Sequence, residues 1–339
     1  MGRSPGDLAI FVGRRLVQLL PVLLGVIILA FVVTHVAAID PCPRWYPKAS
    51  PSTLALCEAQ FRAPIPVQFE HYFTQLLGGN WGTSQLGSPV LPAIATDAPA
   101  TLELVLAALL LMVVIGIPMG VVAAQYAGRW PDHLVRVFYL SGWATPTYVG
   151  AIIAVVYLAH PLGLPTSGEY GAPPPFPQPT HLSVVDALLA GNLPYAADAV
   201  DHLVLPAGVL AFINMGIATR MTRASMLEVL PLDFVKSARM KGLSNLVVLY
   251  KHALRNALIT TTTVLGVTAG ELLAGTVVIE EVFTWPGIGA YAFQSMGGTG
   301  QPNFDGAIAV VVVFAIGVVL ANLIADILYG ILDPRVEWR

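Results

Sequence analysis

The chain has 339 residues, of which 56% are hydrophobic and only 11% are charged, and its formal net charge at pH 7 is −3. A soluble domain has about 25% charged residues, so this composition excludes an ordinary soluble protein. It indicates a membrane protein, and apolar segments cross a membrane as helices.

Six segments are apolar and nearly free of charge over about the 20 residues that a helix needs to cross a bilayer. The first is expected to be a retained span and not a signal peptide, because its apolar run is long and no small-x-small cleavage site ends it. The sequence therefore predicts an all-α polytopic membrane protein with six transmembrane helices at residues 16–38, 101–124, 134–159, 203–219, 259–279 and 307–332.

With six spans, the Lys and Arg residues are distributed unequally between the two sides of the membrane. If the N-terminus is cytoplasmic, 14 of the 17 Lys and Arg fall on the cytoplasmic side, and the remaining ones are Arg44, Lys48 and Arg62. Because Lys and Arg concentrate in cytoplasmic loops, both termini are expected in the cytoplasm.

Two long segments, residues 39–100 and 160–202, are expected outside the cytoplasm, and both are broken by prolines. The first would form a loop subdomain between the tail and first span, 1–38, and a five-helix core, 101–339. It contains Cys42 and Cys57 in a compartment where disulfides persist. A bridge would close a loop of about 15 residues, worth about 3 kcal/mol. The alternative is two unpaired thiols.

The cytoplasmic segment 220–258 is rich in Lys and Arg and reads as helix, turn, helix. Pro231 is expected to end the helix that continues the fourth span, and Asp233 to cap a short helix that ends before Gly242. Gly242 suits the left-handed position after that helix. Ser244 can cap the next helix, one face of which is expected to carry Leu246, Tyr250, Ala253 and Ala257.

Three interpretations of this basic segment compete. As a topology anchor it would hold cations near anionic headgroups, which explains its charge but not its caps or its glycine. As a docking surface it would fit a short helix into a groove of a partner protein, which explains both. A helix-turn-helix for DNA is disfavoured because the turn joins directly to two membrane spans, so no nucleic-acid partner is expected.

Charged residues inside apolar spans are costly and face a cavity or a polar partner. Glu271 is the deepest, and Asp326 lies in the sixth span. Glu271 could line a substrate path, or it could bond to a neighbouring helix, for example to a threonine of the run 260–263, or to a partner subunit. Glu103 lies nearer the interface and is expected to snorkel or to pack.

Two further patterns concern packing and the membrane boundary. Small residues spaced by four let helices approach closely, which favours a packing role for Gly116 with Gly120 and for Gly266 with Gly270. Phe283 and Trp285, just outside the fifth span, are expected in the outer aromatic belt.

No catalytic or metal-binding motif stands out. The chain contains no nucleophile elbow, H-E-x-x-H pair or P-loop, and its seven histidines are scattered without metal-ligand spacing. We therefore expect no catalytic residues, no metal site and no ATP hydrolysis by this chain.

Several blocks resemble one family, the permease subunits of dipeptide, oligopeptide and nickel ABC importers. The basic segment "DFVKSARMKGLSNLVVLYKHALRNAL" looks like that family's cytoplasmic coupling segment, although Lys236 and Ser237 stand where other importers have Glu and Ala. The other blocks occur in the family's order along nearly the whole chain: "GNWGTSQ", "PATLEL", "HLVLPA", "TRASMLEVL", "EEVFTWPGIG" and "NLIADILYGILDPRV".

The resemblance implies a type I ABC importer permease in the bacterial plasma (inner) membrane, which performs no chemistry itself. Two homologous permeases would pair within the membrane lipid. Two ATPase subunits, or a fused ATPase, would bind ATP and Mg and dock on the coupling segment, and an extracytoplasmic binding protein would deliver the cargo. The residues that match the ATPase contact are Ser237, Ala238, Arg239, Lys241 and Gly242. For "EEVFTWPGIG" the resemblance also implies a fixed turn at the outer gate, as the alternative to an aromatic belt.

Within the family, peptides are the commonest cargo, and nickel or another small solute is the alternative. A different class of protein, a stand-alone proton-coupled carrier, would use Glu271 and Asp326 as proton sites. Secondary transporters commonly contain internal repeats, and no repeat is evident here.

Overall fold

The computed structural model describes residues 5–37, 50–83, 88–298 and 303–332. Within these ranges the chain is helical, with one isolated β-bridge between Thr83 and Pro89. Cys42 lies outside the described residues, as does the side chain of Cys57, so the disulfide stays a prediction.

The helices follow one another along the chain, and three of the pieces, η1 to η3, are π-helical. In order they are α1 (Pro5–Ala37), α3 (Pro51–Phe61), α4 (Ile65–Leu77), α5 (Val90–Leu111), η1 (Met112–Gly116), α6 (Ile117–Gln125), α7 (Trp130–Ala144), α8 (Thr147–Ile153), η2 (Ala154–Ala159), α9 (His160–Leu162), α10 (Ser183–Leu189), α11 (Leu193–Val229), α12 (Asp233–Met240), η3 (Val247–Ala253), α13 (Leu254–Val282), α14 (Ile288–Ser295) and α15 (Phe304–Leu332).

Five of the predicted spans are continuous apolar helices in the described residues. They cover Val12–Val32, Val90–Gln125, Leu193–Val229, Val247–Val282 and Asp305–Ile327. The fourth, expected to be the shortest, is instead part of a 37-residue helix that contains Pro206.

The predicted third span, 134–159, is wrong as a single helix. It consists of α7 and the run from α8 to α9, which are bent by 108° at a short break. Pro146 explains the break, because proline lacks an N–H and disfavours helical conformation in the residue before it. Thr145 accordingly has ψ 120°, in the extended region.

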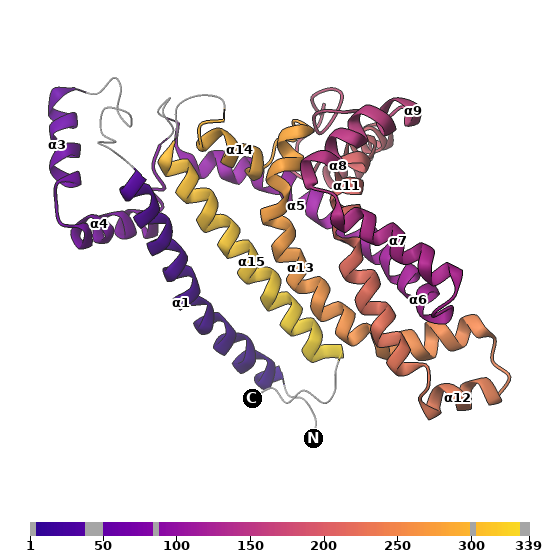
Figure 1. The fold of residues 1–339 in the computed structure, drawn as a ribbon. Helices are drawn as coiled ribbons and strands as arrows, with labels where there is room; N and C mark the ends of the chain where they lie inside the picture. Colours follow the sequence, from indigo (N-terminus) through magenta and orange to yellow (C-terminus); the bar gives the residue numbers. More distant parts are fainter. Residues whose placement is uncertain (1–4, 38–49, 84–87, 299–302, 333–339) are drawn as a thin grey trace.

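The helices form a slanted bundle (Figure 1). α15 lies against both α1 and α13, and α11 lies against α5, α6, α7 and α13. α12, the start of α1 and the end of α15 are at the lower end in this view, and α3, α4, α14 and α9 are at the upper end. This arrangement places the start and the end of the described chain at the same end of the bundle.

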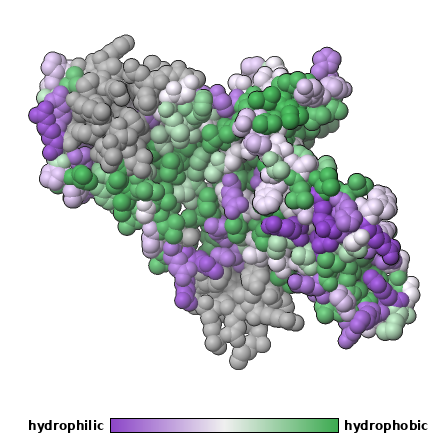
Figure 2. All heavy atoms as spheres, viewed as in Figure 1, coloured by the Kyte–Doolittle hydropathy of each residue, from purple (hydrophilic) through white to green (hydrophobic). Residues whose placement is uncertain are grey.

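Small residues allow the central helices to pack closely against one another. A Cβ on Gly120 would come within 2.7 Å of the Thr219 carbonyl oxygen on α11, and a Cβ on Gly266 would overlap Ala325 on α15. The packing role predicted for the two glycine pairs is confirmed. Large apolar side chains such as Leu20 and Leu110 remain exposed. Figure 2 shows apolar surface over much of this face of the bundle, as expected where lipid or a partner subunit covers it.

Candidate functional site

The segment between α11 and α13 contains the short helix predicted from the sequence. α11 ends at Val229, two residues before Pro231, and α12 begins at Asp233. The N-cap position belongs to Leu232, so the expectation that Asp233 caps α12 is wrong by one residue. The Asp233 carboxylate lies in the first turn instead and accepts a 3.0 Å hydrogen bond from Lys236 Nζ.

One face of α12 packs inward. Val235 is fully buried and Ala238 is 5% exposed, and both belong to a hydrophobic cluster with Met226, Val248 and Leu249. The expected contact between Ala238 and an ATPase is therefore not supported, because the side chain faces the protein's own core. Ala238 fixes α12 against the end of α11 and against η3.

The other face of α12 is exposed and mixes cations with apolar side chains. Met240 is 81% exposed and Phe234 is 42% exposed. We call this face, together with the adjoining turn, the α12 surface; it consists of Phe234, Lys236, Ser237, Arg239, Met240 and Lys241. Exposed apolar side chains next to cations are typical of a surface that another protein covers.

Gly242 ends the α12 surface in the left-handed conformation, with φ 73°. Its N–H donates to the Arg239 carbonyl oxygen at 3.0 Å, and a Cβ at this position would meet nothing within 4 Å. The glycine is therefore required by the backbone conformation and not by lack of space. The left-handed conformation predicted for Gly242 is confirmed.

The helix after Gly242 packs through only two of the four residues expected on its inner face, Ala253 and Ala257, which are both buried. Val248 N–H donates to the Ser244 carbonyl oxygen at 3.0 Å, consistent with a helix that starts after Ser244. Leu246 and Tyr250, expected on the packed face, are 70% and 41% exposed. The cause is the π-helical turn η3, because its wider turn rotates the side chains relative to an α-helix.

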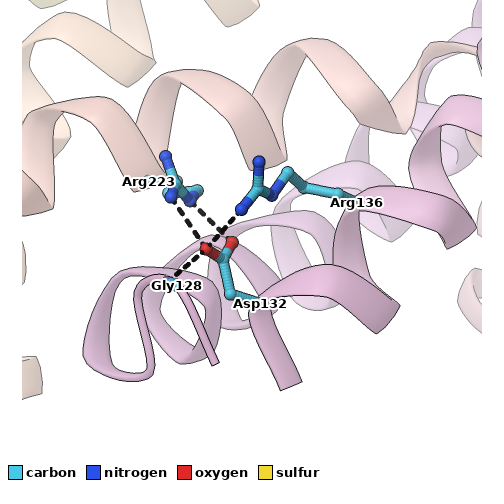
Figure 3. Close-up of polar contacts among 4 residues, drawn as sticks. All are labelled: Gly128, Asp132, Arg136 and Arg223. Atoms are coloured by element: carbon cyan, nitrogen blue, oxygen red, sulfur yellow. Dashed lines mark hydrogen bonds and ion pairs between the residues drawn. The ribbon is translucent and has the colours of Figure 1, made fainter. Parts of the chain in front are cut away.

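A buried carboxylate joins α7 to α11 (Figure 3). The Asp132 side chain is fully buried, and its oxygens accept hydrogen bonds from Arg223 Nε at 2.8 Å and Arg223 Nη2 at 2.9 Å. Arg136 Nη2 and the Gly128 N–H each donate to the same carboxylate at 2.9 Å. Two hydrogen bonds from one guanidinium fix both distance and orientation.

Glu271 lies on an exposed stripe of α13. The stripe has helical spacing and contains Val267, Glu271, Ala274 and Val278, while Leu272 and Thr276 on the other side are buried. Among the described residues the Glu271 carboxylate has no hydrogen-bonding partner, and the Thr263 hydroxyl donates to the Ile259 carbonyl oxygen. The structure therefore does not support the suggested bond to that threonine run, whereas a partner subunit or a substrate could reach this face.

Asp326, the other charged residue in a span, forms an ion pair with Arg15 of α1 at 3.2 Å.

At the upper end of the bundle, a buried carboxylate organises the turn between α13 and α14. Glu280 is fully buried and accepts hydrogen bonds from the Thr101 hydroxyl at 2.8 Å and the Ala290 N–H at 3.0 Å. Thr101 in turn accepts from the Ile288 N–H at 2.8 Å. Thr101 and Glu280 thus tie α5 to this turn.

The prediction of an outer aromatic belt at Phe283 and Trp285 is wrong. Each of these side chains is 1% exposed, and Trp285 Nε1 donates to the Ala100 carbonyl oxygen at 2.9 Å. Both rings fill the space between α5 and the turn, because the chain folds back over them after α13.

Glu103 is a second carboxylate near this end of the bundle, and its role differs from the one expected. It does not snorkel, and it does more than pack. Its oxygens accept hydrogen bonds from the N–H groups of Ser183 and Val184, both at 2.9 Å, at the start of α10. The Ser183 hydroxyl donates to Glu169 at 2.6 Å. Burial and the neighbouring charges of Glu103 and Asp97 raise the pKa of Glu169 to about 7.

Asp132, Glu280 and Glu169 were not among the sequence candidates. Arg223, which pairs with Asp132, and Thr101, which bonds to Glu280, lie on segments distant in the sequence, so the local pattern gives little sign of these contacts. The strongest local signal is the pair Asp132 and Arg136, which are four residues apart at a helix start.

Comparison with known proteins gives a consistent picture. The family described as binding-protein-dependent transport system inner membrane component matches residues 116–338. The probable D,D-dipeptide transport system permease protein DdpB of Escherichia coli K12 is 40% identical, covering 95% of this chain and 96% of the relative.

Other relatives and one solved structure agree. The dipeptide transport system permease protein DppB of Alkalihalophilus pseudofirmus is 36% identical over 96% of this chain and 98% of its own length, and the oligopeptide transport system permease protein AppB of Bacillus subtilis 168 is 35% identical over 98% and 100%. An inward-facing structure of the MetNI methionine ABC transporter has a TM-score of 0.52 at 17% identity, covering 69% of this chain and 93% of that chain. This similarity shows a shared fold.

Proposed function

Because the chain belongs to the family of binding-protein-dependent transport system inner membrane components, we propose that it pairs with a second permease to form the path through which an ATP-driven importer carries di- or oligopeptides. The observation that carries the choice of cargo is the 35 to 40% identity, over nearly the whole chain, to permeases named for dipeptide, D,D-dipeptide and oligopeptide transport.

The α12 surface is the proposed contact for the ATPase subunits, which would bind ATP and Mg. Ser237, Arg239 and Lys241 are exposed there, and Gly242 permits the turn that presents the end of the helix. Val235 and Ala238 anchor the inner face, so a push on α12 is passed to α11 and α13. The ion pair between Arg223 and Asp132 extends this connection to α7.

The stripe of α13 that contains Glu271 is the proposed wall of the translocation path. A carboxylate in a low-dielectric span needs a cationic or hydrogen-bonding partner. A peptide's amino terminus has both properties, and it would pass Glu271 if the second permease closed the path on this side. The small residues Ala274 and Gly275, one turn further along, leave room beside the carboxylate.

The lower end of the bundle in Figure 1 is the proposed cytoplasmic end of a bacterial inner-membrane protein. α12 and the helix ends that carry Arg129, Lys251 and Arg255 lie there, in agreement with the excess of basic residues expected in cytoplasmic loops. The external binding protein would then dock at the opposite end, where α3, α4 and α14 lie.

Uptake by the complete transporter in proteoliposomes tests the proposal. The chain, a second permease, the ATPases and the binding protein are reconstituted, and entry of labelled dialanine is followed with and without ATP. We expect uptake that requires ATP and the binding protein and that persists with a protonophore. Uptake by this chain alone that a protonophore abolishes would instead indicate a proton-coupled carrier, and uptake of labelled nickel but not of dialanine would indicate a metal importer.

A further inference from the structure

A cavity of about 440 Å³ with a mixed polar and apolar lining lies between α1, α13 and α15, away from the α12 surface and the outer turn. It is partly open to the outside, and its volume is within the range of small-ligand pockets. α1 and α13 both pack against α15, and the cavity fills the space between them. Its polar lining consists of Arg15, Gln18, Thr263, Asn322 and Asp326.

The cavity offers both an anion-binding and a cation-binding group. Arg15 Nη1 lies 3.2 Å from Asp326 Oδ2, and both side chains remain partly exposed, at 43% and 31%. Both charged side chains therefore line the cavity and are accessible from it. A ligand of a single charge would meet one attractive and one repulsive group, whereas a zwitterion would satisfy both.

The remaining polar atoms favour a ligand with N–H donors. The Asn322 Oδ1 atom is buried and has no hydrogen-bonding partner in the described structure. The Thr263 hydroxyl already donates to the Ile259 carbonyl oxygen, so it offers only lone pairs to the cavity. Asn322, Thr263 and Asp326 together present acceptors, and a buried acceptor without a donor costs about 1–3 kcal/mol.

The depth of the cavity matches the boundary between lipid tails and headgroups. Arg15 is the fourth residue of the apolar span Val12–Val32, and Asp326 is the last but one of the span Asp305–Ile327. The ion pair therefore lies where the apolar part of the bundle ends, which is the depth at which lipid phosphates and amines are found.

We propose that this cavity binds the headgroup of an aminophospholipid, with the phosphate at Arg15 and the ammonium at Asp326 and Asn322. Phosphatidylethanolamine has both charges and three N–H donors. Phosphatidylcholine has the same charges but no N–H donor, and phosphatidylglycerol has no cation. The acceptors of Asn322 and Thr263 thus select ethanolamine over choline, and Asp326 disfavours an anionic headgroup.

Native mass spectrometry of the intact transporter complex tests this proposal with the three lipids added separately at equal concentrations. We expect the complex to retain phosphatidylethanolamine about tenfold more strongly than phosphatidylcholine or phosphatidylglycerol, since one charge-assisted hydrogen bond is worth about a factor of ten. Asp326→Asn and Asn322→Ala should each remove this preference. Arg14→Gln, which changes the neighbouring exposed cation outside the cavity, should leave it intact.

The same spectra report whether each variant still assembles, so a failure to fold is seen directly. Equal retention of the three lipids by the unchanged complex would overturn the proposal. It would also be overturned if assembled Asp326→Asn and Asn322→Ala complexes both kept the preference for phosphatidylethanolamine, or if phosphatidylglycerol were retained best.

Discussion

Arg223 of α11 donates two hydrogen bonds to the buried carboxylate of Asp132 at the start of α7, six residues before α11 ends. α12 begins four residues after that end. The ion pair therefore fixes the α6–α7 hairpin to the part of α11 from which α12 emerges. A displacement of this end of α11 must either move α7 as well or break the pair.

Asp132→Ala should destabilise the protein strongly. Removing the carboxylate leaves Arg223 and Arg136 without their shared anion, and breaking a buried ion pair costs about 3–5 kcal/mol. Thermal unfolding of the purified complex should show a clearly lower melting temperature. The control is Asp233→Ala, which breaks the exposed pair with Lys236 and should change the melting temperature little. Equal shifts in the two variants would contradict the role of Asp132.

Gly242→Val should uncouple ATP hydrolysis from transport. A β-branched residue at φ 73° is strained by about 1–2 kcal/mol, so the turn would relax and α12 would be presented differently. We expect the variant to assemble and to hydrolyse ATP, but to import several-fold less dialanine per ATP. Gly242→Asn is the matched control, because asparagine tolerates the left-handed region and the site has room for its side chain. Tight coupling in the valine variant would show that the turn is not essential.

Glu271→Gln should slow cargo passage without affecting the ATPases. The variant keeps the shape of the side chain but loses the charge offered to a peptide's ammonium, which is worth about tenfold. Dialanine uptake should fall by about that factor, while ATP hydrolysis stimulated by the binding protein stays near normal. Glu281→Gln, an exposed glutamate on the same helix, should transport normally. If both variants transported like the unchanged protein, Glu271 would have no part in the path.

Gly287→Ala should destabilise the outer turn. A Cβ at this position would overlap the Glu280 carboxylate and the Thr101 hydroxyl, both fixed by their hydrogen bonds. Such overpacking costs about 1–3 kcal/mol, measurable as a lower melting temperature. Gly208→Ala in α11 is the control, since its Cβ would meet nothing within 4 Å and alanine favours a helix. A melting temperature for Gly287→Ala at or above the control value would be inconsistent with the packing described.

The loop between α9 and α10 should be more stable at low pH. The pKa of Glu169 is raised from 4.5 to about 7, so the folded loop retains a proton that the unfolded loop releases. The resulting stabilisation is complete below about pH 4.5 and is lost as the pH rises through about 7. Hydrogen exchange in residues 163–182, corrected for the intrinsic effect of pH, should show less protection at pH 8 than at pH 5.

Glu169→Gln mimics the protonated side chain, so it should keep the loop protected at pH 8. Glu70→Gln, an exposed residue of α4, should leave the pH dependence unchanged. Protection that does not vary with pH in the unchanged protein would exclude Glu169 as its source.

Features that depend on local chemistry could be predicted from the sequence. Hydropathy located the spans, Pro231 marked the end of α11, and Gly242 marked the left-handed turn after α12. These succeeded because a single residue type determines the outcome at each position. The break in the third span was missed because the two helices together are apolar enough to pass as one span, even though the proline itself was visible.

Features that depend on which way a side chain faces could not be predicted. Tryptophan is a residue type that is common at membrane boundaries, yet the fold of the turn buries Trp285 against Ala100. Leu246 and Tyr250 were assigned to the packed face on an α-helical period that the π-helical turn interrupts. Arg223 and Asp132 are 91 residues apart, so their pairing follows only from the packing of α11 on α7.

Because α11 is one long continuous helix, a small rotation at one of its ends produces a large displacement at the other. Its 37 residues extend about 55 Å, more than the 40–45 Å thickness of a bilayer with its headgroups. One end is capped by Asn192 beside the outer segments, and the other leads into α12. A rotation of about 10° about one end would carry the other end through about 10 Å. A small angular change at the α12 end is in this way converted into a large displacement at the outer end of the bundle.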